Sequence, residues 1–419
     1  MFRPQLRQRY QLFKPGMKRW PPRIGVSFMV VPLLLLLIGC GTPGGDQQSN
    51  KASASSAPFS HPGVLDSKSQ LDFVKQQVQQ GAEPWTTAFN QAKSSRYASL
   101  SWTPKPRAVV ECGPYSNPDF GCADERNDAA AAYTDALIWY ISGDSRYASK
   151  AVQIMDAWSA TITSHTNSNA PLQAGWTGLV FPEAAEIIRY TSTSWSAAGI
   201  TRFEEMLRNV YLPEVINGNA RSNGNWELTM INASLAIAVF LDDHASFAKA
   251  LSMWRARVPA YFYLTSDGPL PHPPPGAGPM TKEQIISYWQ GQSTFVDGLS
   301  QETCRDLTHT QYGIATAING AEIAWHQGVD LYSEEATRLT KAMEFHASYV
   351  LGKAAPSWLC KGTLSRTAPF PTWEIGYNHY HNVSKMALPF TQQLIQTKLR
   401  PTGVEHIVTW ETLTHANVN

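Results

Sequence analysis

The chain contains 419 residues, of which 43% are hydrophobic, 16% charged and 11% aromatic, and its 34 Lys and Arg residues nearly balance its 33 Asp and Glu residues. A charged fraction well below the roughly 25% of average soluble domains, together with abundant aromatic rings, excludes a disordered, solvated chain. The near-zero net charge gives no support for nucleic-acid binding. The aromatic rings are numerous enough to line a carbohydrate cleft as well as a core.

Residues 1–39 predict a signal peptide that is removed on export. Seven Lys and Arg residues, with no Asp or Glu, precede the apolar stretch 24–38, which is too short to span a bilayer comfortably. The stretch ends in Leu37-Ile38-Gly39-Cys40, which resembles a bacterial lipobox. We therefore expect an exported bacterial lipoprotein, lipidated on Cys40 and held in the periplasm or outer membrane by this anchor alone. The alternatives are an uncleaved anchor and a plain secretory signal.

Residues 40–66 are rich in Ser, Ala, Gly and Gln and predict a flexible tether. The four remaining cysteines form an even set, which in an exported chain favours disulfides. The segment from Cys112 to Cys122 holds two Pro and two Gly and has the character of a loop closed by a disulfide. Cys304 and Cys360 then pair by elimination. The rival, a metal site, lacks a Cys-x-x-Cys pair.

Helical patterns dominate from about Leu71 onward, and strand-like alternation is scarce. The predicted helices are 129–141, 147–158, 182–190, 202–210, 228–240, 247–258, 312–327 and 334–351. Two long Pro-containing irregular stretches, 264–300 and 354–380, interrupt them, and loops of this length are usually functional. We expect residues 67–419 to form a single all-α domain of antiparallel helix pairs closed into a toroid.

The first candidate site segment is 300–319. If it is helical, the spacing places Glu302, Arg305, His309, Tyr312, Thr316 and Asn319 on one face. A solvated helix face is the common alternative, but such faces are usually rich in Lys and Glu, whereas this one carries His, Tyr, Arg and amides. The pattern therefore favours a catalytic face with Arg305, His309 and Tyr312, and with Gln301 and Glu302 as substrate contacts.

Two further segments carry candidate site residues. Gly224 breaks the chain before an apolar run, so that Asn225 is predicted at a helix N-terminus, as a simple cap or as an amide aimed into a cleft beside Trp226. In 377–382, His379 and His381 share a face if the backbone is extended. They would need a third ligand such as His309 or Asp306 to bind zinc. Catalysis by His379 and substrate contact by Asn378 and His381 are favoured, packed polar structure is the alternative, and no cofactor is expected.

Weaker signals complete the candidate site. Arg126 and Asn127 could bind an anion near a helix start, or could belong to a capping network. Trp176 and Trp289 lie in Gly-containing segments predicted as loops and suit sugar stacking. His406 lies among surface-like residues and is not predicted to act. The sequence contains no P-loop and no GxGxxG, GxSxG or HExxH motif.

Three of these features resemble the alginate lyase superfamily. Residues 131–148 are similar to its helix-turn-helix signature and 223–243 to its Asn-containing catalytic helix, while Arg305 and Tyr312 match the active-site Arg and Tyr seven residues apart. The resemblance covers about 71–415 and is nearest to the branch that contains polysaccharide lyase family thirty-eight, more distant from family five. It implies an (α/α)-toroid and elimination across uronic acid linkages in an anionic polysaccharide, alginate or glucuronan.

One departure leaves the base open. The family-five pattern has a His directly after the catalytic Asn, and this chain has Trp226 there. The expected chemistry assigns neutralisation of the uronate carboxylate to Asn225 and Arg305. The base is then His309, His379 or an ionised Tyr312, whose pKa Arg305 would depress, and Tyr312 is the first choice for the acid.

Two rival functions remain at this point. A glycoside hydrolase would need two carboxylates across the bond, for example Glu227 with Asp306 or Glu302. A non-catalytic glycan-binding lipoprotein would need the aromatic rings but not the Arg, His and Tyr on one face.

Overall fold

The structure, a computed structural model, describes residues 57–401 and 403–418. The predicted signal peptide, Cys40 and most of the predicted tether lie outside the described residues. The α-helices are α1 (Lys68–Gln79), α2 (Trp85–Ser94), α3 (Cys122–Ser142), α4 (Ser145–Ser159), α5 (Ala170–Thr191), α6 (Ala197–Met206), α7 (Leu212–Val215), α8 (Gly224–Phe240), α9 (His244–Tyr261), α10 (Lys282–Tyr288), α11 (Leu307–His326), α12 (Leu331–Glu334), α13 (Ala336–Val350), α14 (Glu374–Tyr377), α15 (Pro389–Leu394) and α16 (Glu411–His415).

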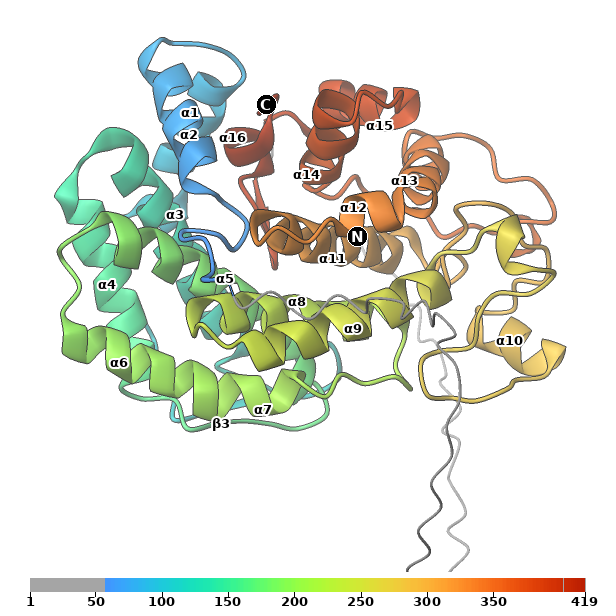
Figure 1. Cartoon of the computed structure of the whole chain (residues 1–419), viewed down its shortest axis with the longest axis horizontal. Helices are drawn as coiled ribbons and strands as arrows, with labels where there is room; N and C mark the ends of the chain where they lie inside the picture. Colours follow the sequence, from blue (N-terminus) through green and yellow to red (C-terminus); the bar gives the residue numbers. More distant parts are fainter. Residues whose placement is uncertain (1–56, 402, 419) are drawn as a thin grey trace, which may run out of the picture. The chain divides into compact units, whose positions relative to one another are not determined.

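The long helices form an inner and an outer layer, which confirms the predicted all-α toroid. Along the inner layer α3 packs on α5, α5 on α8, and α8 on α11, whereas α4 and α9 cover α3 and α8 from outside (Figure 1). Every residue of α8 except Trp226 is buried, and apolar residues lie on every face of the helix, as expected for a helix surrounded by others. The inner helices therefore fix the positions of whatever side chains their ends carry.

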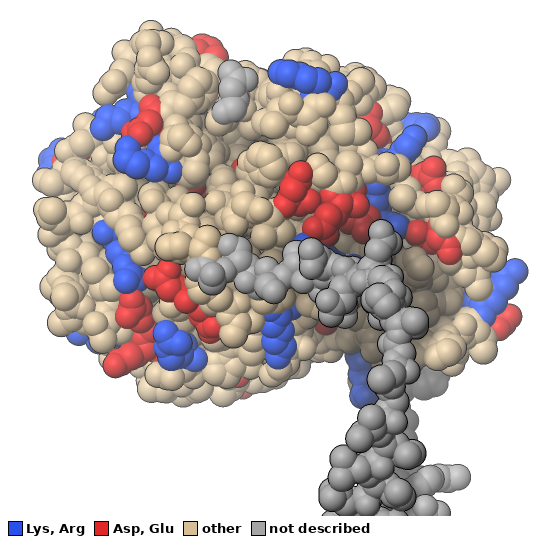
Figure 2. Space-filling view, in the orientation of Figure 1, with Lys and Arg blue, Asp and Glu red and all other residues tan. Residues whose placement is uncertain are grey.

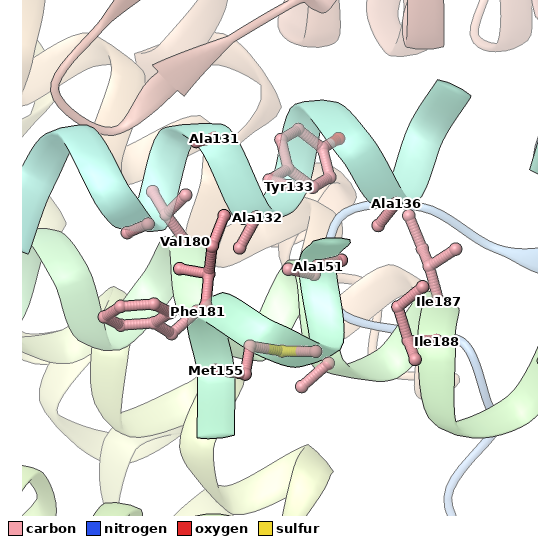
Figure 3. Packing of buried hydrophobic residues seen from close by; sticks show 14 of the residues in the cluster. Ala131, Ala132, Tyr133, Ala136, Ala151, Met155, Val180, Phe181, Ile187 and Ile188 are labelled. Atoms are coloured by element: carbon pink, nitrogen blue, oxygen red, sulfur yellow. The ribbon is translucent and has the colours of Figure 1, made fainter. Parts of the chain in front are cut away.

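Small side chains allow the inner helices to approach closely. Ala131, Ala132 and Ala136 of α3 are fully buried in one core cluster with Met155 of α4 and Phe181 of α5 (Figure 3). Alanine adds little bulk to a helix surface, so the bulky partners can fill the grooves between its turns. The Ala-rich run of the sequence is thus the contact surface between neighbouring helix pairs.

Two predicted helix starts are corrected. α3 begins at Cys122 rather than at residue 129, directly after Gly121, whose φ of +90° turns the chain into the helix. α5 begins at Ala170 and includes the segment predicted as a loop around Trp176. Its Gly175 is a packing residue: a Cβ there would lie 2.9 Å from Thr229 of α8. The glycine signals helix contact here, not a turn.

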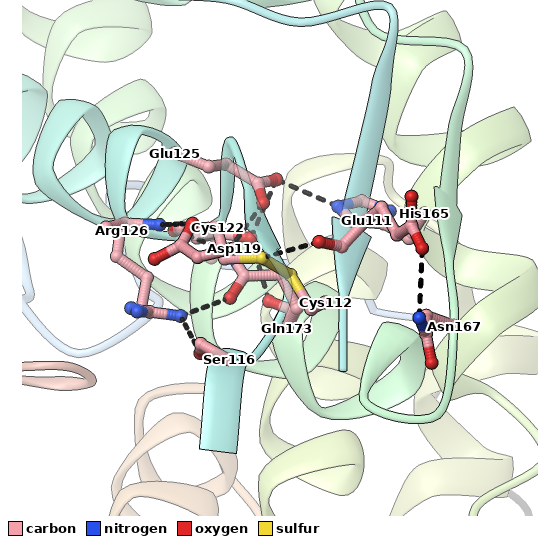
Figure 4. The surroundings of a disulfide bond; sticks show 12 residues. Glu111, Cys112, Ser116, Asp119, Cys122, Glu125, Arg126, His165, Asn167 and Gln173 are labelled. Atoms are coloured by element: carbon pink, nitrogen blue, oxygen red, sulfur yellow. Dashed lines mark hydrogen bonds and ion pairs between the residues drawn. A yellow bond between two sulfur atoms is a disulfide. The ribbon is translucent and has the colours of Figure 1, made fainter. Parts of the chain in front are cut away.

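The few strands support loops near the ends of the helices. β1 (Val109–Cys112) pairs antiparallel with β2 (Asp119–Phe120) and parallel with β3 (Ser164–Thr166), whereas β4 (Val404–Glu405) and β5 (Val408–Thr409) form a hairpin. Both predicted disulfides are confirmed. Cys112–Cys122 joins β1 to the first residue of α3 (Figure 4), and Cys304–Cys360 joins the turns that precede α11 to the irregular stretch 354–380.

The folded unit begins earlier than the predicted boundary at residue 67. Within the N-terminal strap, which we define as residues 57–66, Val64 and Asp66 are buried. His61 lies 2.9 Å from Glu186 in α5, and His326 in α11 lies 3.1 Å from the carbonyl of Val64. The strap therefore packs on the C-terminal ends of inner helices and is not free tether. In the part of the chain that the structure describes, no helix combines the length and apolarity needed to span a bilayer.

Candidate active site

A cleft of about 600 Å³ lies at the opposite, N-terminal ends of the inner helices. Its walls come from the first turns of α3, α5, α8 and α11, from the disulfide-closed loop and from the β4–β5 hairpin. The predicted site residues that line it are Arg126, Trp176, Asn225, Trp226, Arg305, His309 and Tyr312. Residues far apart in the sequence thus meet because four inner helices begin at one place.

Glu302 is a buried carboxylate that orients two cleft residues. Its Oε2 accepts the side-chain amide of Asn225 at 2.6 Å, and its Oε1 accepts Arg305 Nη1 at 2.8 Å. The hydroxyl of Tyr261 donates to it as well, at 3.0 Å. Glu302 has no exposed surface, so the predicted substrate contact is corrected to a positioning role.

Gln301 holds the start of α8 in the same way. Its Oε1 accepts the backbone N–H of Gly224 at 3.1 Å, and its Nε2 donates to Asn223 Oδ1 at 2.9 Å. Gln301 is fully buried and does not reach the cleft, contrary to the prediction. Its contacts fix the helix end from which Asn225 projects.

The predicted continuous helical face over 300–319 is wrong. Residues 301–305 form turns, and α11 begins only at Leu307, after the N-cap Asp306. The Asp306 carboxylate accepts the backbone N–H of His309 at 2.8 Å, which satisfies a donor that the helix start leaves unpaired. Thr316 and Asn319 lie deeper in α11 and are buried. Only His309 and Tyr312 reach the cleft from the helix itself.

His309 and Asp306 form a pair suited to proton abstraction. His309 Nδ1 lies 2.8 Å from both carboxylate oxygens of Asp306. Burial alone would raise the pKa of Asp306, but the hydrogen bonds from His309 hold that pKa below its ordinary value. A charged Asp306 keeps the proton of a neutral imidazole on Nδ1 and leaves Nε2 as the accepting nitrogen. This arrangement is that of a general base oriented by a carboxylate.

Tyr312 is held as a protonated phenol. Burial and the neighbouring Glu405 raise the pKa of Tyr312 well above its ordinary value, and Arg126 opposes this rise only in part. The prediction that Arg305 depresses this pKa is therefore wrong. A phenol that keeps its proton can donate it to a leaving group but cannot act as the resting base.

His406 is a cleft residue that the sequence pattern did not reveal. It lies in the turn between β4 and β5, with its Nδ1 2.7 Å from the Tyr312 hydroxyl. Its ring centroid is 4.7 Å from that of Trp176, over which the guanidinium of Arg126 lies at 5.3 Å. Because 94 residues separate His406 from Tyr312, no local spacing rule could have joined them.

Arg126 and Asn127 have different surroundings despite being neighbours. Arg126 Nη1 donates to Gln173 Oε1 at 2.6 Å and to Ser116 Oγ at 3.3 Å (Figure 4), which aims the guanidinium along the cleft wall. Asn127 does not line the cleft, and its Oδ1 accepts Arg96 Nη2 at 2.7 Å. Consecutive residues of a helix point about 100° apart, and here that rotation turns Asn127 away from the cleft wall that Arg126 faces.

The segment 377–382 does not belong to the cleft. Asn378 and His379 line a separate pocket of about 260 Å³ with Glu322 and His326 at the C-terminal end of α11. The backbone there is helical, not extended, so His379 and His381 do not share a face. His379 stacks on Tyr332 with ring centroids 3.6 Å apart, and His381 Nδ1 lies 2.9 Å from the Met386 carbonyl.

These positions bear on the alternatives of zinc binding and hydrolysis. No group of three or more His, Cys, Asp or Glu that could hold a metal ion is found within 57–401 and 403–418. Glu227 is buried in an ion pair with Arg257, and Glu302 is buried beneath Asn225. The carboxylates considered for a hydrolase therefore do not face each other across the described cleft.

Comparison with known proteins gives a consistent result. Residues 65–273 match the sequence model of the alginate lyase family, and no curated protein matches the chain by sequence. Alginate lyase A1-III from Sphingomonas species A1 is structurally similar, with 16% identity, a TM-score of 0.57, and coverage of 86% of this chain and 99% of that one. An alginate lyase from Bacteroides ovatus is similar with 13% identity, a TM-score of 0.53, and coverage of 85% and 99%.

A His-to-Ala variant of the Sphingomonas enzyme, solved in complex with a tetrasaccharide, gives a TM-score of 0.58 at 16% identity and covers 87% of this chain and all of its own. The solved structures, at 13–16% identity, support the helical toroid alone. The family match over residues 65–273 identifies the chain as a polysaccharide lyase of the alginate lyase superfamily. That the chain lies nearest to the branch containing polysaccharide lyase family thirty-eight stays a prediction from the sequence.

Proposed function

We propose that the protein cleaves a 1,4-linked polyuronate by β-elimination, with alginate as the first substrate and glucuronan as the alternative. The observation that carries the proposal is the convergence of Asn225, Arg305, His309 and a protonated Tyr312 on one cleft. The match to the alginate lyase family and the oligosaccharide complex of a structural relative support a polyuronate as the substrate.

Asn225 and Arg305 act on the uronate carboxylate. The C5 proton of a uronate is hardly acidic while the adjacent carboxylate keeps its full charge. Hydrogen bonds from the Asn225 amide and the Arg305 guanidinium withdraw that charge and stabilise the enolate-like intermediate. Glu302 holds both donors before substrate arrives, so that little reorganisation is needed on binding.

His309 and Tyr312 move the protons. His309 Nε2 removes the C5 proton, and its imidazolium form is stabilised by Asp306. The C4–O4 bond then breaks, a C4–C5 double bond forms, and Tyr312 gives its hydroxyl proton to O4. The raised pKa of Tyr312, caused by its burial and by Glu405, keeps that proton in place until the leaving group needs it.

An absorbance assay tests the proposal. The purified protein is incubated with alginate, polymannuronate, polyguluronate and glucuronan in parallel. Elimination gives an unsaturated uronate that absorbs in the ultraviolet, and we expect this signal with at least one polymer. Saturated reducing ends without absorbance would support the hydrolase instead. Binding without cleavage of any of the polymers would support a glycan-binding protein.

For the cellular location we propose lipidation of Cys40 after export, on the strength of the lipobox-like sequence 37–40. Metabolic labelling with palmitate in the producing bacterium tests this proposal. We expect label in the wild-type protein and none in Cys40→Ser, with the wild-type protein in the membrane fraction. An unlabelled wild-type protein would contradict the lipid anchor and leave the lyase activity unaffected.

A further inference from the structure

The β4–β5 hairpin presents a histidine to the hydroxyl of Tyr312. Glu405 pairs with Val408 across the hairpin, which leaves His406 and Ile407 as the two turn residues. Ile407 is buried in the core, while His406 lines the cleft. The hairpin is thereby anchored by one turn residue and directs the other at the reacting end of the site.

The backbone of this turn is unusual for the residue that it carries. His406 has a φ of +51°, in the left-handed region that favours glycine. A side chain in this region costs about 1–2 kcal/mol, and such costs gather where a side chain is held for function. Glycine would relieve this strain, so the imidazole is kept against a local conformational preference.

His406 also links a buried hydroxyl to solvent. Tyr312 is packed against Phe370, with ring centroids 4.4 Å apart, and its hydroxyl lies 2.7 Å from His406 Nδ1. The side chain of His406 is 26% exposed and that of Glu405 is 42% exposed. Glu405 Oε1 contacts the same Nδ1 and lies 3.4 Å from the Tyr312 hydroxyl. The three groups form a continuous path from the Tyr312 oxygen to water.

The charges that face this path are few among the described residues. Glu405 comes from β4, and Arg126 from α3 acts on the charges of both Tyr312 and Glu405. Trp176 from α5 and Phe370 contribute uncharged rings. The hydrogen bond from His406 holds the pKa of Glu405 below its ordinary value. Nδ1 of His406 therefore faces both the Glu405 carboxylate and the Tyr312 hydroxyl.

We propose that Glu405 and His406 form a proton relay that restores the hydroxyl of Tyr312 after each elimination. This inference rests on the proposed lyase function. When Tyr312 gives its proton to O4, the imidazolium of His406 gives its Nδ1 proton to the phenolate, so that the O–H bond reforms as the N–H bond breaks. His406 regains a proton from water through the Glu405 carboxylate. His309 releases the C5 proton to water, so that protons balance over one turnover.

The relay supplies the proton that Tyr312 needs after each elimination. A phenolate left in this buried site is unfavourable, so rapid reprotonation speeds the return to the resting state. His406 acts through Tyr312, so its loss should cost less than loss of Tyr312 itself. We expect kcat to fall by roughly 10- to 100-fold, at or below the lower end of the usual contribution of acid–base groups. KM should change by less than about 2-fold, since the carboxylate contacts are untouched.

Two variants at one position test the relay. His406→Gly suits the positive φ and removes the imidazole, which opens space beside Trp176 for added imidazole. His406→Asn keeps a hydrogen-bonding amide and tolerates the backbone, but it does not titrate. We expect both to lose kcat, and we expect imidazole in the buffer to restore His406→Gly in proportion to its concentration. His244→Asn, at the start of α9 and stacked on Phe59, is the matched control and should stay at the wild-type rate.

The outcomes are separable from those of the main proposal. Wild-type kcat in His406→Asn, or a loss in His406→Gly that imidazole does not restore while KM and thermal stability are unchanged, would overturn the relay. Imidazole rescue, together with loss of the alkaline-side fall of the kcat–pH profile in His406→Asn, would establish it. If the wild-type protein itself releases no unsaturated product, the lyase proposal fails, and that failure is seen before any variant is compared.

Discussion

Polar clusters that contain histidine lie at both ends of α11. At the N-terminal end, His309 and Tyr312 face the cleft. At the C-terminal end, Glu322 accepts the Tyr332 hydroxyl at 2.7 Å and pairs with His326 at 3.3 Å and His415 at 3.6 Å. The residue types are similar at the two ends, and both ends carry charge, yet only one end is arranged for catalysis.

The difference lies in which hydrogen-bonding groups remain available. At the C-terminal end, Glu322 of α11 and His415 of α16 are buried and lie 3.6 Å apart, and the neighbouring His326 contacts the Val64 carbonyl of the N-terminal strap. At the cleft, His309 is fixed through one nitrogen by Asp306, which leaves the other nitrogen for a substrate. An acid–base site needs a group that is oriented on one side and unengaged on the other.

The largest expected effect on catalysis comes from removing the Tyr312 hydroxyl at the cleft end of α11. Tyr312→Phe removes the hydroxyl and little else, so we expect kcat to fall by roughly 1,000-fold, within the range for a general acid. The melting temperature should stay near the wild-type value, because the ring still packs on Phe370. Release of unsaturated product measures the first effect and thermal unfolding the second. An active Phe variant would remove Tyr312 from the role of acid.

Histidine variants at each end compare the two clusters directly. His309→Gln should lower kcat by roughly 100-fold, because the amide cannot accept the C5 proton. His379→Gln should leave kcat within about 2-fold, because His379 lies in the separate pocket. The same absorbance assay serves both. Equal losses in the two variants would contradict the assignment of the base.

Glu302→Gln tests orientation within the cleft. Glutamine has one accepting oxygen, and its amide would face the donors of Asn225 and Arg305. We expect kcat/KM to fall by about 10-fold while the helical content stays unchanged by circular dichroism. An unaffected kcat/KM would show that Asn225 and Arg305 are held well enough by other contacts.

The sequence predicts the features of this arrangement that are local in the chain better than the contacts between residues far apart in it. The disulfide pairs, the all-α toroid, and the pairing of Arg305 with Tyr312 follow from local pattern or family resemblance. Asn225 at a helix start follows from Gly224 and the apolar run after it. The Cys112–Cys122 loop and the start of α8 are local, so spacing locates them, whereas Cys304–Cys360 follows by elimination and the Arg305 and Tyr312 match from the family resemblance.

The errors arise where tertiary contacts decide. Burial sets the pKa of Tyr312, and no sequence window shows burial of a hydroxyl beside Glu405. The helical path of 374–383 turns His379 away from the cleft, whereas the sequence leaves open an extended path in which His379 and His381 share a face. Trp289 is buried in a core cluster and not available to stack on a sugar. His406 reaches Tyr312 only because the C-terminal hairpin folds back on the inner helices.

The smallest expected effect on catalysis comes from the buried cluster at the C-terminal end of α11. This cluster should instead change how the stability of the fold depends on pH. Burial raises the pKa of Glu411 to about 7, and the pKa of His415 is raised by Glu322 although burial opposes it. Both raised values mean that the folded state binds more protons than the unfolded chain in this range. Stability should therefore fall as pH rises from about 5 to 8.

Glu411→Gln should reduce this fall by about 2–3 kcal/mol, as measured by urea unfolding at the two pH values, while kcat at the cleft stays near the wild-type value. A variant with the wild-type pH slope would show that Glu411 does not titrate with folding.

Electrostatic attraction at the cleft has a source beyond its side chains. Acidic and basic side chains are interspersed on the face drawn in Figure 2, and loss of residues 1–39 would leave the chain net acidic. The inner helices α3, α5, α8 and α11 all begin at the cleft, and each helix start carries about half a positive charge from its aligned peptide dipoles. This convergent field belongs to the backbone, and the carboxylates of Asp306 and Glu302 at the starts of α11 and α8 offset part of it. For the polyanionic substrate proposed above, it would add an attraction that does not depend on the protonation of any side chain.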